Sequence, residues 1–99
     1  MAQFDVYAMK RGRGFLLDCQ TDFVAGLETR LVAPLLLWED YSSPAKRLNP
    51  VFDIAGGRVV MMTQYLGAIE RRELGANVAN LASEHLAITS AIDMLLTGF

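Results

Sequence analysis

The sequence has only one cysteine, one histidine and three prolines among its 99 residues. A single cysteine, Cys19, cannot form an internal disulfide bond, which favours a reducing compartment. One Cys and one His are too few for a transition-metal site built from these residue types. The sequence also lacks a phosphate-binding loop or a dinucleotide fingerprint. We therefore expect no metal and no cofactor.

Long apolar runs and an excess of basic charge are also missing. The longest clean apolar run, residues 35–38, is far shorter than the ~20 residues that a spanning helix needs. Residues 1–5 lack the features of a signal peptide. Nine Lys and Arg face eleven Asp and Glu, for a net charge of -2, which argues against nucleic-acid binding by the chain alone. These absences predict a cytoplasmic protein with no membrane contact.

Apolar residues, in contrast, are abundant, at 53% of the chain. A chain of this length fits a single domain, residues 1–99, with one core. The apolar content exceeds what such a small core can bury. Because the interfaces of obligate homodimers resemble a core cut in half, we expect a homodimer.

The first 74 residues carry the alternation and turn signals of β-strands. A basic loop, residues 10–14, separates the first two strands, and Pro34 suggests an edge strand or a bulge. Gly56 and Gly57 predict a two-residue hairpin turn. The strands predicted from these patterns are residues 3–8, 15–20, 29–37, 51–55 and 58–64, with a weaker candidate within 67–74.

The last quarter of the chain has the periodicity of a helix instead. Apolar or neutral residues recur every three and four positions, with Asn77 as a plausible N-cap. The helix would run for ~20 residues to the end of the chain. Its apolar surface is wider than one stripe, so we expect it to pack on both the sheet and a partner subunit. The seam consists of Val78, Leu81, His85, Ile88, Ile92, Leu95 and Phe99.

These elements define an α+β fold that is mainly antiparallel β, with about five strands in a partly closed sheet and one C-terminal helix. Several blocks of sequence resemble the CcdB family of toxins, in the family's order and across nearly the whole chain. The blocks are residues 3–7 (QFDVY), 14–22 (GFLLDCQTD), 30–35 (RLVAPL), 48–54 (LNPVFDI), 61–63 (MMT) and 91–99 (AIDMLLTGF).

The resemblance implies a fold shared with the MazF toxins, including a small extra sheet and a long C-terminal helix. It also implies a homodimeric toxin of a type II toxin–antitoxin module, of the kind that serves plasmid maintenance. Such toxins bind the A subunit of DNA gyrase and trap it on cleaved DNA. A CcdA-like antitoxin neutralises the toxin, and the two together bind operator DNA and repress their own operon.

Carried onto this sequence, the family's gyrase contacts fall on the chain end and on two other places. They map to Phe23, Val24, His85, Asp93, Leu96, Thr97, Gly98 and Phe99. Thr97 stands where the best-known member has a tryptophan, a frequent type of binding hot spot. Phe99 could restore an aromatic contact two positions later. The basic residues Lys10, Arg11 and Arg13 are candidates for contact with an acidic antitoxin segment or with phosphates. They could equally belong to a solvated hairpin loop without a partner.

Other interpretations of the same residues stay open at this point. Gly98 can end the helix in a left-handed conformation without any partner. Cys19 is expected to be a small core residue rather than a nucleophile paired with histidine. An endoribonuclease like MazF or Kid could use the basic and acidic residues Arg11, Arg13, Asp18 and Arg30. The replacement of the family's tryptophan by Thr97 would also be explained if this chain were a degenerate, non-toxic member of the family.

Overall fold

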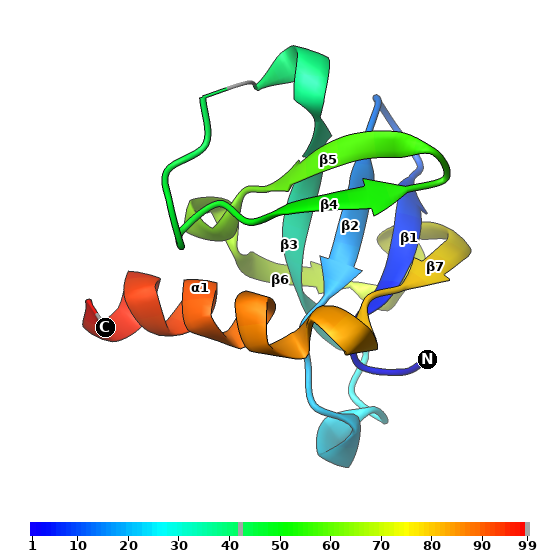
Figure 1. The fold of residues 1–99 in the computed structure, drawn as a ribbon. Coiled ribbons are helices and arrows are strands. Elements are labelled where there is room, and N and C mark those ends of the chain that lie inside the picture. The colour runs from blue at the N-terminus through cyan, green and yellow to red at the C-terminus, as the bar shows by residue number, and fades with distance from the viewer. Residues whose placement is uncertain (42, 99) are drawn as a thin grey trace.

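The structure, a computed structural model, describes residues 1–41 and 43–98. They form one antiparallel seven-stranded sheet in the order β4-β5-β3-β2-β1-β7, with β6 also paired to β3 (Figure 1). This confirms the mainly antiparallel α+β fold with a curled sheet and a C-terminal helix. The strands are β1 (Asp5–Met9), β2 (Phe15–Asp18), β3 (Thr29–Leu37), β4 (Val51–Ile54), β5 (Gly57–Met61), β6 (Gly67–Glu70) and β7 (Leu74–Asn80). The helices are α1 (His85–Thr97) and the 3-10 helices η1 (Asp22–Val24), η2 (Trp38–Asp40), η3 (Thr63–Tyr65), η4 (Arg71–Glu73) and η5 (Ala82–Glu84).

Strand β3 is the centre of the sheet because it pairs with three other strands. β2 lies along one edge of β3, and β6 and then β5 lie along the other. The prediction that Pro34 marks an edge strand or a bulge is wrong. Its carbonyl accepts a hydrogen bond from the Met62 N–H at 2.8 Å. The nitrogen and the C=O of one strand residue point to the same side of the strand. The Pro34 nitrogen, which has no hydrogen to donate, therefore faces the junction between β6 and β5, where no ladder bond is lost.

The β4–β5 hairpin turns one residue earlier than predicted. Its central residues are Ala55 and Gly56, with φ of 50° and 79°, while Gly57 already pairs with Ile54. Two positive φ values define the type of turn whose twist suits a tight hairpin. This register places Asp53 opposite Arg58, an opposite-charge pair that a turn at residues 56 and 57 would separate.

The helix begins later than the apolar seam predicts. Asn77 and Val78 belong to β7, which pairs with β1, and Asn77 lies opposite Tyr7. The carboxamide of Asn80 accepts a hydrogen bond from the Ala82 N–H at 2.7 Å, so the helical segment starts just after Asn80. The predicted Asn77 cap is therefore wrong: β7 continues to Asn80 and replaces the first residues of the predicted helix.

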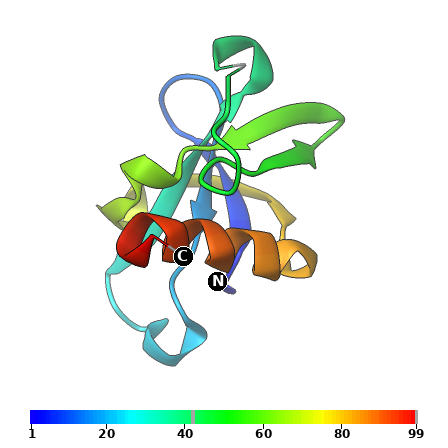
Figure 2. The ribbon, with the colours of Figure 1, turned by 60° about the vertical axis from the view of Figure 1, so that its left-hand side comes forward.

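Helix α1 and the β4–β5 hairpin lie on the same face of strands β1–β3 (Figures 1 and 2). The main core fills the space between them, with Ile88 of α1 and Phe52 of β4 among its buried residues. A smaller cluster of Tyr7, Val32 and Leu74 covers the opposite face of the sheet. The prediction of a single core did not include this second cluster. Among the described residues, no helix has both the length and the apolar character to cross a membrane.

Candidate functional site

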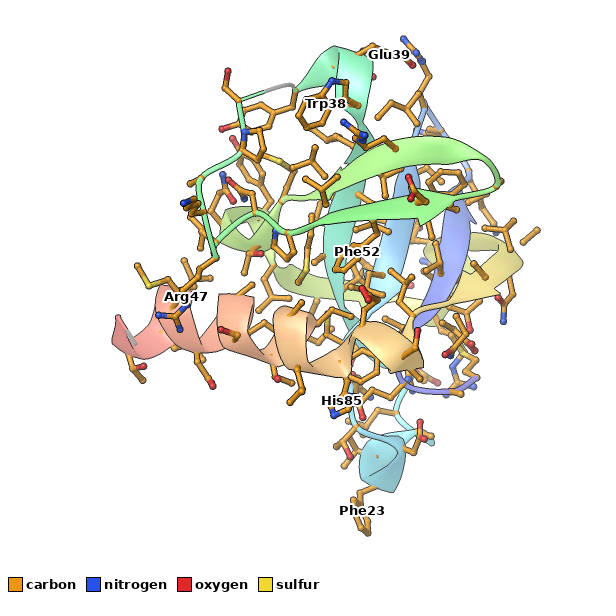
Figure 3. The ribbon with its side chains drawn as sticks, in the orientation of Figure 1. Phe23, Trp38, Glu39, Arg47, Phe52 and His85 are labelled. Carbon is orange, nitrogen blue, oxygen red and sulfur yellow. The ribbon has the colours of Figure 1, made fainter. Side chains whose placement is uncertain are left out.

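The segment after β2 forms a small lobe that projects from the body of the molecule. We define this η1 lobe as residues 21–28. Phe23 lies at its tip and points away from the rest of the chain (Figure 3). Its side chain is 99% exposed, and Val24 beside it is 41% exposed. An aromatic ring held this far from its own core gains no burial from folding, so the lobe presents it to solvent.

The base of the lobe rests on a fully buried ion pair. The guanidinium of Arg30 donates from Nε and Nη2 to one Asp18 carboxylate oxygen, at 3.0 and 2.6 Å. The other carboxylate oxygen accepts the Gln20 N–H at 3.0 Å. The Gln20 side chain then donates to the Val24 carbonyl, also at 3.0 Å. These bonds connect the buried pair, through Gln20, to Val24 beside Phe23.

The end of α1 forms a second exposed surface. Leu96 is 71% exposed, and Asp93, Thr97 and Gly98 are exposed as well. Gly98 has φ of 81°, and its N–H donates to the Met94 carbonyl at 3.0 Å. The predicted left-handed end of the helix is thus confirmed at Gly98. The prediction for Phe99 lies outside the described residues.

His85 lies at the opposite end of α1 from this surface. Its side chain is exposed, and its Nδ1 lies 3.1 Å from the Ala82 carbonyl. His85 is the first residue of α1 and is exposed in the single chain, so its predicted place in a seam shared with a partner subunit stays a prediction. At 1.5 Å per residue, ~18 Å of helix separate His85 from Thr97. The predicted contact residues thus cover an extended surface rather than a pocket.

An exposed residue that was not among the predicted contacts lies on this same helix. Leu86 is 74% exposed. At 100° per residue, it lies on the same outward face as Asp93 and Thr97. Their spacing of seven and four residues could have indicated this face from the sequence, but the wide apolar surface of the helix hid which side turned outward.

The basic loop lies at the far end of the molecule from the η1 lobe. Arg13 forms ion pairs with Glu39 and Asp40 of η2, at 2.6 and 3.3 Å. Figure 3 shows Glu39 and Phe23 at opposite ends of the structure. Lys10 donates to the backbone carbonyl of Arg72, and Arg11 is exposed. The candidate antitoxin contacts are therefore separate from the candidate gyrase contacts within one chain.

The residues that an endoribonuclease could use are not gathered at the surface. Both side chains of the Asp18–Arg30 pair are 0% exposed, so neither can reach a phosphate in solution. Cys19 is also buried, as predicted for a core residue. Burial, together with the nearby Asp18 carboxylate, raises the pKa of the Cys19 thiol to about 12. The thiol is protonated at neutral pH and is therefore a poor nucleophile.

The structure defines a small α+β domain with a curled antiparallel sheet and one C-terminal helix. The family model described as CcdB protein matches residues 3–98. The chain therefore belongs to the CcdB family, which makes it a toxin of a toxin–antitoxin module. Comparison with curated protein sequences found no match.

Proposed function

We propose that this toxin acts as a homodimer that binds the A subunit of DNA gyrase, traps the enzyme on cleaved DNA and catalyses no reaction itself. The observation that carries the proposal is the 99% exposure of Phe23 at the tip of a projecting lobe. Aromatic residues, phenylalanine included, are enriched at protein interfaces. Membership of the CcdB family supports gyrase as the partner that receives this ring.

The end of α1 provides the second part of the proposed gyrase surface. Leu96 and Thr97 are exposed at the end of the helix, beside Gly98. In a homodimer with α1 near the twofold axis, two copies of this end would face a twofold target surface. By binding one conformation of gyrase more tightly, the toxin would shift the enzyme toward the cleaved-DNA state.

The basic loop is the proposed contact for a CcdA-like antitoxin. Arg11 is exposed, while Arg13 is held by two exposed acidic residues. An acidic antitoxin segment could replace these exposed ion pairs at little cost, since such pairs contribute only ~0–1 kcal/mol. The toxin alone carries a net charge of -2, which argues against DNA binding by the toxin on its own. We therefore assign operator binding to the complex of toxin and antitoxin.

The structure favours this function over an endoribonuclease. Two of the four charged residues that could have formed a ribonuclease site, Asp18 and Arg30, are bonded to each other in the interior. A non-toxic family member remains the second candidate, because Thr97 lacks the ring of the family's tryptophan. The exposed aromatic of Phe23 supports an active toxin instead.

The proposal is tested by replacing Phe23 with alanine. We expect Phe23→Ala to weaken inhibition of gyrase supercoiling by about 30-fold or more, which corresponds to a hot spot of ~2 kcal/mol. Its unfolding free energy should stay within ~0.5 kcal/mol of the wild type, since the ring makes no buried contact. Supercoiling assays over a range of toxin concentrations measure the first effect, and urea denaturation measures the second.

Tyr65→Ala is the matched control, because Tyr65 is an aromatic residue that is 66% exposed but lies on η3 rather than on the lobe. We expect it to inhibit gyrase as strongly as the wild type. Equal inhibition by wild type and Phe23→Ala would show that the lobe does not contact gyrase. Cleavage of RNA by the purified protein would support the ribonuclease instead.

A further inference from the structure

The η1 lobe has a defined shape although it has no core of its own. None of residues 21–29, all of which the structure describes, is buried. Turn bonds inside the lobe join the Val24 N–H to the Thr21 carbonyl at 3.3 Å and the Leu27 N–H to the Val24 carbonyl at 3.1 Å. Ordering a backbone segment costs conformational entropy that burial does not offset here. Hydrogen bonds from outside the lobe must therefore contribute to its order.

Arg71, the first residue of η4, donates three of these bonds. Its backbone N–H bonds the Glu28 carbonyl at 2.7 Å. Its Nη2 bonds the Ala25 carbonyl at 3.1 Å and also the Leu27 carbonyl. The contribution of Arg30 to the same lobe is one longer bond, 3.4 Å, to the Ala25 carbonyl. Neutral donors outside the lobe bond it as well, from the Gln3 N–H to Asp22 at 2.8 Å and from the Gln20 side chain to Val24 at 3.0 Å. Because charged donors form stronger hydrogen bonds than neutral ones, the Arg71 guanidinium is the strongest side-chain tie between the lobe and the body.

We infer that Arg71 is a positioning residue for partner binding, because it fixes the η1 lobe and so holds Phe23 ready to bind. This inference rests on the proposed role of Phe23 in binding gyrase. A loop that is already ordered loses less conformational freedom on binding than a loose loop, and binds more tightly for that reason. If only a fraction of molecules had the lobe in place, the apparent affinity would fall by that fraction.

The next residue provides a matched control. Arg72 has the same side chain, is also exposed, and forms an ion pair with Glu70 on the surface. Within the described part of the chain, its backbone carbonyl also accepts a bond from Lys10, which a change of side chain leaves in place. Arg71→Met and Arg72→Met therefore remove the same charge from adjacent positions, but only the first removes bonds to the lobe.

The first measurement is hydrogen exchange of the full-length protein, read by mass spectrometry. We expect Arg71→Met to speed exchange in residues 22–28, while Arg72→Met leaves exchange there as in the wild type. The melting temperature of both variants should stay close to that of the wild type, because the replaced side chains are exposed. Unchanged exchange in the lobe of Arg71→Met would overturn the inference, whatever the protein does to gyrase.

The second measurement is binding to the purified gyrase A subunit. We expect Arg71→Met to bind roughly three- to tenfold more weakly than the wild type, as the ordering cost of a few groups implies. Arg72→Met should bind as the wild type does. Arg71→Lys should fall between Arg71→Met and the wild type, since an ammonium group can bond a carbonyl but lacks the fork of donors.

A double-mutant cycle with Phe23→Ala separates this inference from the proposed function. If Arg71 acts through Phe23, adding Arg71→Met to Phe23→Ala should weaken binding no further. An unchanged effect of Arg71→Met in that background would overturn the inference while leaving the proposed role of Phe23 intact. Normal gyrase binding by Phe23→Ala itself would instead refute the role of Phe23, and the inference with it.

Discussion

The buried ion pair of Asp18 and Arg30 is the residue-scale feature that lies at the base of the η1 lobe. Both side chains are 0% exposed, and the second carboxylate oxygen is bonded to the Gln20 backbone. Removing one partner of a buried pair leaves an uncompensated charge in the interior. We therefore expect Arg30→Met to lower the free energy of unfolding by ~3–5 kcal/mol, as measured by urea denaturation.

The double variant Asp18→Leu with Arg30→Met is the control for this prediction. It removes both charges, so it should lose less stability than Arg30→Met alone, because well-packed apolar residues can replace a buried pair at little cost. A single variant as stable as the wild type, or a double variant less stable than the single, would contradict this view of the pair.

Some single residues could be assigned from the sequence and others could not. Cys19 and Gly98 were predicted correctly, as a core residue and a left-handed helix end, because each depends only on local chemistry. The predicted place of His85 in a seam with a partner subunit stays a prediction, because a partner-facing residue is exposed in a single chain. The bonds of Arg71 were out of reach, because they join segments that only the folded chain brings together.

The β4–β5 hairpin provides a test at the scale of one element. Ala55 has φ of 50°, a left-handed conformation that disfavours alanine, beside Gly56 with φ of 79°. Asn-Gly is the preferred pair for this turn, because Asn tolerates positive φ. We expect Ala55→Asn to raise the free energy of unfolding by ~0.5–1 kcal/mol in urea denaturation.

Ala55→Val is the opposite change, because a β-branched residue is a clear outlier at positive φ. It should destabilise the protein relative to the wild type. Equal stability of the Asn, Val and wild-type proteins would mean that the turn does not have the conformation described here.

The bounds of the elements were predicted with unequal success. The range 29–37 predicted for the third strand matches β3 (Thr29–Leu37). The hairpin turn was displaced by one residue, since Gly56 and Gly57 look alike in sequence and only the pairing of Asp53 with Arg58 distinguishes the registers. The helix was predicted too long because Val78 fits a helical seam as well as a strand, and only the pairing of β7 with β1 decides between them.

At the scale of the whole molecule, the η1 lobe and the basic loop lie at opposite ends of a small domain. The η1 lobe with its exposed ring lies at one end, and the basic loop paired to η2 lies at the other (Figure 3). The fold that places them was predictable in class, since strand alternation and the resemblance to the CcdB family agreed. The separation of the two surfaces could not be predicted from the sequence, because it follows from the order of the strands in the sheet rather than from distance along the chain.

The central claim is that exposed surfaces of this toxin bind gyrase, and removing the end of the chain tests it most directly. The full chain and a chain ending at Leu96 would each be incubated with gyrase, ATP and supercoiled plasmid, with sedimentation used to check that both are dimers. We predict that the full chain traps gyrase on cleaved DNA and releases linear plasmid after protein digestion, while the shortened dimer does not. Linear plasmid at equal yield from both proteins, or from neither, would contradict the account.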